Sequence, residues 1–230
     1  MRPFLTRILL VLLLVFVSSV LFAGAQEASL EEFQYGIAPG SDLEALARRG
    51  RVLGSKNFMF TDEASGERRL SGYGEYHAVY PATVDDLLSV LLDIPAYPDV
   101  LPMILESSLL ETRGNHYVSR VSSGISLPGF KQIYTVTSEA IVERFPDGSI
   151  GLRSFLLYCE DDKLYEHYLS WYLEPVRVND QAMTYVRYFN RPGIRKPFPG
   201  LIIIIRLFAD SNLRDQVESL AKEALRRSAD

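Results

Sequence analysis

The segment "VDDLLSVLLDIPAYPDVLP", from Val84 to Pro102, decides the fold that the sequence predicts. Thr83 can cap a helix here, and Asp86 supplies a carboxylate where the start of a helix favours negative charge. Residues 93–95 stop this helix, and residues 96–101 can form one further helical turn. The apolar side chains of the first helix form one stripe at helical spacing: Val84, Leu87, Leu88, Leu91 and Leu92.

Strand-like runs lie on both sides of these two short helices. The run "GYGEYHAVY" before them ends a long strand at Tyr80, and a polar turn over residues 63–67 separates it from a possible earlier strand. Consecutive strands joined by short turns predict an antiparallel meander. Six more candidate strands come after the helices: 104–112, 116–125, 131–143, 150–158, 165–174 and 182–190.

The last part of the chain predicts a long helix over residues 199–227. The run "LIIIIRLF" within it could also form a strand, because it is rich in β-branched residues. We favour the helix because Pro199 and Gly200 open it and no clear turn separates the run from the helical pattern of residues 209–227. Its second half carries one apolar stripe: Leu213, Val217, Leu220, Ala221, Ala224 and Leu225.

These elements fit one architecture. An antiparallel sheet of this length must curl, because twist accumulates from strand to strand. Its concave face is apolar, and the last helix buries its stripe by lying across that face. The two short helices then close one end of a tunnel. The more apolar set on each of three strands is turned inward: Tyr165, His167, Leu169, Trp171 and Leu173; Tyr134, Val136, Ala140 and Val142; Ile150, Leu152, Ser154 and Leu156.

The order of segments resembles the helix-grip fold of the START-like and polyketide-cyclase-like (SRPBCC, Bet v 1-like) superfamily, in an exported bacterial member. The stretch Val84 to Pro102 looks like the superfamily's segment after its first strand. Three later segments add to the resemblance: "ISLPGFKQIYTVTSEAIVERFPDGSIGLRSF", "LSWYLEPV" and "NRPGIRKPFPGLIIIIR". The resemblance implies an α+β fold, with a curved antiparallel sheet of about seven strands, two short helices after the first strand, and a long C-terminal helix across the concave face.

The resemblance also implies a cavity for one hydrophobic molecule, such as a lipid, a quinone or a sterol-like compound. Cavities of this kind are mostly apolar, with a few polar groups that orient the ligand. The chain has 13 tyrosines, which combine an apolar ring with a hydroxyl group. We expect the cavity to be lined by Tyr117, Tyr134, Val136, Leu152, Ser154, Leu156, His167, Leu169, Trp171, Arg187, Ile204 and Phe208.

An enzymatic alternative stays open, because the superfamily also includes cyclases and hydratases that act on hydrophobic substrates. The sequence spacing places no pair of acid and base residues, so we name no catalytic residue and favour a non-enzymatic binding protein. His77, His116 and His167 lie on separate predicted strands, so we expect neither a metal site nor a cofactor. The single cysteine, Cys159, is interpreted as a half-buried strand residue.

The N-terminal residues match a secretory signal. Arg2 and Arg7 precede a strongly apolar run, 8–22, and the small residues "AGA" at 23–25 suit a signal peptidase. We therefore expect a cleaved signal peptide, 1–25, and a periplasmic or secreted protein. The alternative is an uncleaved helix that anchors the chain.

After the signal, we expect an N-terminal extension, 26–71, and then the START-like domain, 72–228. The extension contains a short helix, 42–49, in which Ser41 and Glu44 form a capping box. Removing residues 1–25 takes away two arginines and no acidic residue, so the net charge changes from −5 to −7. An acidic chain without a cluster of Lys and Arg is a poor candidate for binding nucleic acid or anionic membrane surfaces, so we expect no nucleic-acid partner and at most transient contact with membranes. No pattern specifies an oligomeric state.

Overall fold

The computed structural model describes residues 33, 35–127 and 130–229 of the chain. The predicted signal peptide, 1–25, lies outside the described residues. Within them, none of the helices has the length and apolar character needed to cross a membrane.

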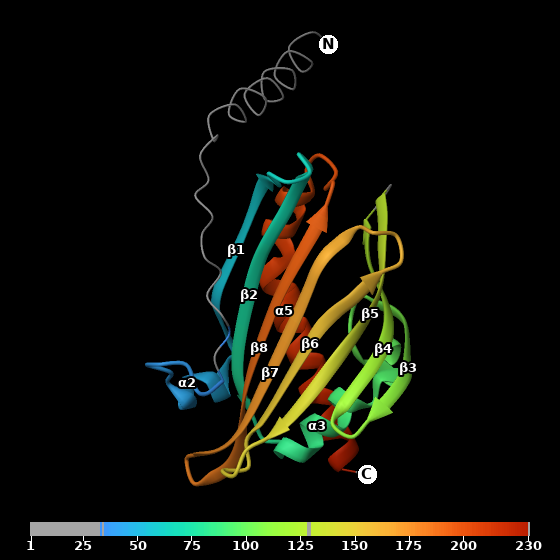
Figure 1. Ribbon diagram of the computed structural model, residues 1–230. Helices are drawn as coiled ribbons and strands as arrows, with labels where there is room; N and C mark the ends of the chain where they lie inside the picture. Colours follow the sequence, from blue (N-terminus) through green and yellow to red (C-terminus); the bar gives the residue numbers. More distant parts are fainter. Residues whose placement is uncertain (1–32, 34, 128–129, 230) are drawn as a thin grey trace, which may run out of the picture. The chain divides into compact units, whose positions relative to one another are not determined.

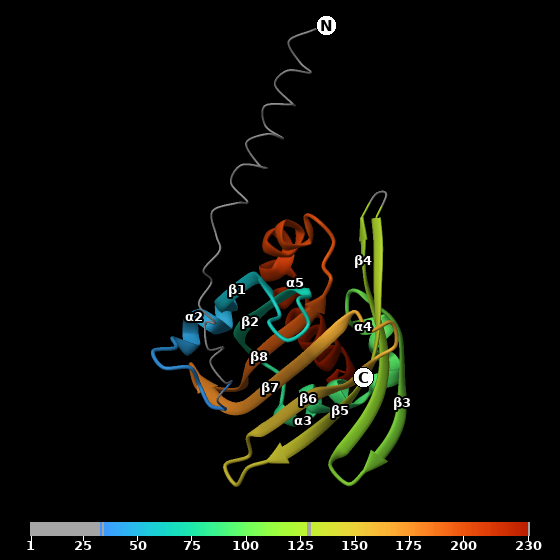
Figure 2. The same ribbon diagram turned by 45° about the horizontal axis from the view of Figure 1, so that its top comes forward.

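Eight strands form one antiparallel sheet in the order β1-β2-β8-β7-β6-β5-β4-β3 (Figure 1). Figure 2 shows the curvature of this sheet from β1 round to β3, as expected from accumulated twist. The strands are β1 (Arg51–Thr61), β2 (Arg68–Tyr80), β3 (Ile104–Arg113), β4 (His116–Leu127), β5 (Phe130–Arg144), β6 (Ile150–Cys159), β7 (Leu164–Val178) and β8 (Gln181–Arg195).

The predicted α+β helix-grip class is confirmed, but the sheet has eight strands where we expected about seven. The additional strand is β1, which we treated as a possible strand of the N-terminal extension. It pairs with β2 from Arg51↔His77 to Thr61↔Arg68. As an edge strand it is largely half-exposed or exposed, so its sequence lacks the strong apolar signal of a central strand.

The strands β7 and β8 are longer than predicted. We ended them near Pro175 and Asn190, whereas their ladder runs from Leu164↔Ile194 to Val178↔Gln181. The turn between them contains only Asn179 and Asp180, both with positive φ. Asparagine and aspartate tolerate this backbone conformation, which the tight turns of two-residue hairpins require.

The segment from Val84 to Pro102 folds as predicted. The helix α3 (Val84–Leu92) starts with a capping box in which Thr83 and Asp86 each accept a backbone hydrogen bond at 3.1 Å. A short 3₁₀ helix, η1 (Ile94–Ala96), and the helix α4 (Tyr97–Val100) come next. The Tyr97 hydroxyl donates to the carbonyl of Leu91 at 2.5 Å and so ties the two helical pieces together.

The C-terminal helix α5 (Leu201–Ser228) confirms the helical interpretation of "LIIIIRLF". Its second half packs on one face of the sheet, and Leu213, Val217, Leu220, Ala221 and Ala224 are buried there. A Cβ atom on Gly74 of β2 would lie 2.6 Å from the Leu213 side chain. The glycine therefore allows the helix to approach the sheet closely.

The opposite face of the sheet is covered by residues near the beginning of the described chain. The helix α2 (Leu43–Arg48) and Phe33 contribute to a buried cluster there. Asp42, not Ser41, caps α2, because its carboxylate accepts the hydrogen bond from the Ala45 amide at 3.0 Å. The sheet residues of this cluster are Val79, Tyr172, Val178, Tyr185 and Phe189.

Candidate functional site

The face of the sheet under α5 carries two separate apolar clusters. The first, which we call the helix cluster, joins α3 and the second half of α5 to side chains that include Tyr76, Leu152, Trp171, Leu173, Val186 and Tyr188. The second, the end cluster, consists of Leu70, Tyr134, Val136, Leu164, Ile194 and Leu201. Strand alternation places both clusters on the same face, since Val136 and Val142 lie six residues apart on β5.

Small and polar side chains occupy this face between the two clusters. One row across the sheet has the register Gly74↔Asn190, Asn190↔Leu169 and Leu169↔Ser154. The neighbouring row contains His167, opposite Pro192, and Ser138, opposite both Ser119 and Leu156. We call these two rows the central band: Gly74, Asn190, Leu169, Ser154, Ala140, Tyr117, Pro192, His167, Leu156, Ser138 and Ser119.

Three buried polar atoms of the central band have no hydrogen-bond partner among the described residues. They are Asn190 Oδ1, Ser138 Oγ and His167 Nδ1. A buried polar group without a partner is costly, and in native proteins it calls for a partner such as a bound water molecule or a ligand. Burial also lowers the pKa of His167 to about 4, so its imidazole is neutral at pH 7. The band therefore offers neutral hydrogen-bonding groups inside apolar surroundings.

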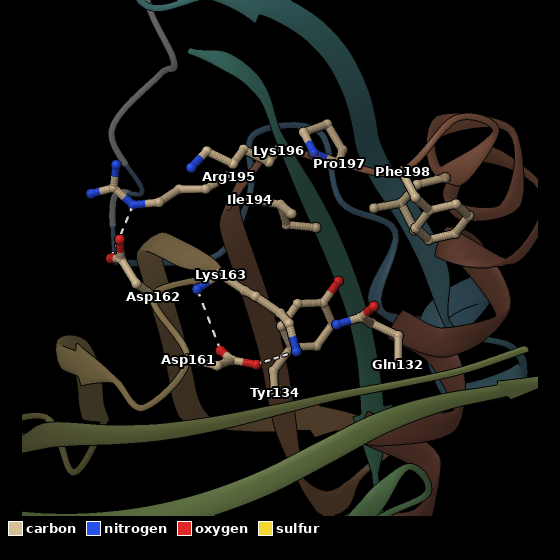
Figure 3. Close-up of a pocket in the computed structure, with 11 residues that line it drawn as sticks. Gln132, Tyr134, Asp161, Asp162, Lys163, Ile194, Arg195, Lys196, Pro197 and Phe198 are labelled. Atoms are coloured by element: carbon tan, nitrogen blue, oxygen red, sulfur yellow. Dashed lines mark hydrogen bonds and ion pairs between the residues drawn. The ribbon is translucent and has the colours of Figure 1, made fainter. Parts of the chain in front are cut away.

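A pocket of about 290 Å³ opens beside the end cluster (Figure 3). Tyr134, Ile194, Phe198 and Leu201 form its apolar part. Burial raises the pKa of Tyr134 to about 12, so its hydroxyl remains protonated. Its remaining lining residues are polar or charged, apart from Pro197: Gln132, Asp161, Asp162, Lys163, Arg195 and Lys196.

The pocket lies where β6 and β7 separate. Their ladder runs only from Ile150↔Leu173 to Phe155↔Tyr168, although both strands continue toward the turn that joins them. Two ion pairs lie along this turn: Lys163 with Asp161, and Arg195 Nε with Asp162 Oδ1 at 3.2 Å. The charged side chains that line the pocket therefore lie near the turn between β6 and β7, away from the central band.

The structure brings together most of the residues that we expected to line a cavity. Tyr117, Tyr134, Val136, Leu152, Ser154, Leu156, His167, Leu169 and Trp171 all lie on the face under α5. This confirms the inward sets chosen on β5 and β6, and on β7 for Leu169, Trp171 and Leu173. Tyr165 was wrong, because a register shift between Leu164 and Glu166 puts Leu164 on this face and the Tyr165 ring on the other, against Arg69. Of the residues that we expected to line the cavity, Tyr134 alone borders the described pocket. A ligand-binding role for all of them, Tyr134 included, stays a prediction.

Three of the predicted lining residues are placed differently. Arg187 was wrong as a lining residue, because it lies on the opposite face, where it pairs with Glu75. In α5, the positions that pack on the end cluster are Leu201, Ile202 and Ile205. The predicted Ile204 and Phe208 are not among them, and Phe208 is 45% exposed. Four successive isoleucines carry no helical period, so the sequence could not indicate which of them face the sheet.

Sequence reasoning missed Asn190 and Ser138. The alternation along 182–190 hardly distinguished one face from the other, because both faces carry aromatic residues. Asn190 comes after Tyr188 at a spacing of two, which puts both on one face of a strand. The signal available in the sequence was therefore the polar amide of Asn190 two positions after the aromatic Tyr188.

The remaining reactive side chains do not converge. His77 contacts Tyr185 on the face opposite α5, and His116 pairs with Glu139. In the described part of the chain, no group of three or more His, Cys, Asp or Glu residues is placed to hold a metal ion. Burial raises the pKa of the half-buried Cys159, whose thiol donates to Asp161 at 3.1 Å. This suits a thiol and not a reactive thiolate.

Solved structures with the same architecture come from several organisms. A STAR-related lipid transfer protein from Xanthomonas axonopodis matches with 19% identity and a TM-score of 0.51, over 75% of this chain and 94% of that one. Human StAR-related lipid transfer protein 5 matches with 12% identity and a TM-score of 0.54, over 79% of this chain and 90% of that one.

A START superfamily protein from Mycobacterium smegmatis matches with 14% identity and a TM-score of 0.50, over 67% of this chain and 97% of that one. The chain has the START-like helix-grip fold. The resemblance carried by the sequence is thus confirmed for the fold. No protein-family model and no curated protein matches the chain by sequence. In this START-like fold, the face of the sheet under α5 is the candidate site.

Proposed function

We propose that the chain binds one hydrophobic small molecule, such as a lipid, a quinone or a sterol-like compound, between the sheet and α5. The observation that carries the proposal is the central band. Small side chains and unpaired buried polar atoms separate two apolar clusters there, where a filled core would have continuous apolar packing. The lipid transfer proteins with the same fold support this class of ligand.

The physical chemistry of the site suits non-covalent binding. Removing apolar surface from water contributes about 25 cal/mol per Å², so a lipid-sized molecule can be held without covalent chemistry. The pocket beside the end cluster offers an entrance, because its apolar wall of Tyr134, Ile194 and Leu201 belongs to that cluster. If residues 1–25 direct export, as the sequence leads us to expect, this binding takes place outside the cytoplasm.

A cyclase or hydratase activity would need an acid–base pair within the same space. A hydrogen bond from His167 or Arg187 to a tyrosine there would favour it. Among the described residues His167 Nδ1 has no partner, and Arg187 lies on the other face. No observation therefore favours catalysis over binding.

The proposal is tested by native mass spectrometry and lipid extraction of protein purified from its own host. We expect one bound hydrophobic molecule per chain. In a second measurement, Ser154→Phe places a large side chain in the central band and should abolish binding of added lipid, with unchanged circular dichroism. Leu157→Phe on the same strand is the control, because Leu157 is 52% exposed. A protein that is empty as isolated and also refuses fatty alcohols, fatty acids and quinones would rule the proposal out.

A further inference from the structure

We infer that the ligand carries an uncharged oxygen group, such as a hydroxyl or a carbonyl, partway along its apolar body, and that the central band binds this group. The inference rests on the proposed function and specifies its ligand class. It comes from the position, the charge and the hydrogen-bonding capacity of three side chains: Ser138, His167 and Asn190.

The three side chains come from three strands, β5, β7 and β8, and lie on the same face of the sheet. Ser138 lies between Val136 of the end cluster and Ala140 beside the helix cluster. Asn190 is opposite both Gly74 and Leu169, and Leu213 of α5 lies directly above Gly74. A ligand that spans both apolar clusters would therefore pass these polar groups near its middle.

The central band has no charged side chain. All of its members are apolar, glycine, hydroxyl or amide residues apart from His167, which is neutral because burial lowers its pKa. None of these strand residues supplies a cation, so a carboxylate or phosphate buried among them would lose its hydration without gaining an ionic partner from the sheet, which is unfavourable. The cations Lys163, Arg195 and Lys196 line the pocket at the end of the site instead.

The hydrogen-bonding capacity of the band matches a neutral oxygen group. A serine hydroxyl donates and accepts, a neutral imidazole has one donor and one acceptor, and an amide has both kinds of atom. A ligand hydroxyl can thus donate to one of these groups and accept from another. Satisfying buried atoms in this way favours an alcohol over a hydrocarbon of the same length.

Two serines provide a matched pair for the test. Ser138 and Ser170 are both buried, at 6% and 0% exposure, and the Oγ atom of each has no partner among the described residues. Ser138 faces α5, whereas Ser170 lies between Tyr168 and Tyr172 of the cluster on the opposite face. Replacing either by alanine makes the same chemical change, but only one of the two sites faces the ligand.

The experiment measures binding of dodecan-6-ol (called dodecanol below), which carries its hydroxyl group mid-chain, and of dodecane and dodecanoate to the full chain at pH 8, by the fluorescence of Trp171, the only tryptophan. Trp171 belongs to the helix cluster and lies two residues from Leu169 of the band. We expect dodecanoate to bind at least about tenfold more weakly than dodecanol. Ser138→Ala and Asn190→Leu should each reduce the preference for dodecanol over dodecane by about five- to tenfold, whereas Ser170→Ala should not change it.

The outcomes separate the two proposals. If all three compounds bind but Ser138→Ala leaves the preference unchanged, or if dodecanoate binds as tightly as dodecanol, the inference about the polar group is overturned and the proposed function stands. If none of the three compounds binds, the proposed function fails as well. Thermal unfolding of each variant shows whether it is folded. Ser138→Ala removes only one oxygen atom, so this variant still provides the test if Asn190→Leu does not fold.

Discussion

Arg187 attaches the beginning of the described chain to the face of the sheet opposite α5. Its guanidinium pairs with Glu75, donates to the Gly36 carbonyl at 3.1 Å, and lies 4.9 Å from the centre of the Phe33 ring. The side chains of Arg187 and Glu75 are each only 14% exposed. The strand pattern had suggested a ligand-binding arginine, but the structure gives this residue a structural role.

Removing Arg187 should be strongly destabilising. The change Arg187→Met leaves the Glu75 carboxylate buried without its cation, which costs about 3–5 kcal/mol. The free energy of unfolding in urea measures this cost. The double variant Glu75→Leu/Arg187→Met is the control and should recover most of the loss, because it leaves no buried charge. A loss below about 1 kcal/mol in the single variant would contradict the assignment.

His77 should make stability depend on pH. Its Nδ1 lies 3.2 Å from the Tyr185 hydroxyl, and burial, together with the smaller effect of the charges of Arg187 and Arg51, lowers its pKa from 6.5 to about 4. Between these two values the unfolded chain binds the proton and the folded chain does not. The stabilisation is therefore complete above pH 6.5 and is lost as the pH falls toward 4.

For the single proton of His77, the free energy of unfolding falls by at most about 1.4 kcal/mol per pH unit. Burial lowers the pKa of His167 to about 4 as well, so it adds a contribution of the same sign. We expect His77→Gln to unfold with a weaker dependence on pH between 7 and 5 than the unmodified chain, as measured by urea unfolding at each pH. Equal slopes in the two proteins would show that His77 titrates normally.

At the scale of the elements, α5 has a buried second half and a partly exposed first half. Leu220 is fully buried in the helix cluster, whereas Leu207 is 72% exposed. Leu220→Ala should therefore lower the free energy of unfolding by about 2–5 kcal/mol through lost burial and a new cavity. Leu207→Ala makes the same change on the same helix and should stay within about 0.5 kcal/mol. Similar losses in both variants would mean that the helix is packed differently.

The elements also show which features the sequence can predict. The helix α3 was predictable because its cap, Thr83 with Asp86, and its apolar stripe are local in the chain. The register of the first half of α5 was not, because it depends on contacts with residues such as Leu70 and Ile194, far away in sequence. The strand β1 was weakly predicted because an edge strand is half-exposed and has little apolar alternation.

At the scale of the whole molecule, the fold was predictable from the order of its elements, whereas the site was predictable only in part. The inward sets on β5 and β6 and most of that on β7 could be read from alternation, since one face of each strand is more apolar. Asn190 and Ser138 could not be assigned, because the meaning of a polar residue on an apolar face depends on its neighbours across the sheet. Those neighbours are fixed by strand register, which the sequence does not state.

Ligand binding should stabilise the whole chain. A molecule that binds only the folded state at a concentration one hundred times its dissociation constant adds about 2.7 kcal/mol to the free energy of unfolding. We expect dodecanol to have this effect on the unmodified chain and none on Ser154→Phe, as measured by urea unfolding. Stabilisation of both proteins to the same extent would place the binding outside the central band.

The short ladder between β6 and β7 divides the sheet into two panels. One panel is β1-β2-β8-β7 and the other is β6-β5-β4-β3, and backbone pairing joins them only from Ile150↔Leu173 to Phe155↔Tyr168. Beyond this seam the panels can spread without breaking any rung of a ladder, while lifting α5 would bring Leu213, Val217 and Leu220 into water. At the end where the pocket lies, the two panels are therefore joined by side-chain packing: Tyr134 and Val136 of one panel belong to the same buried cluster as Leu164 and Ile194 of the other.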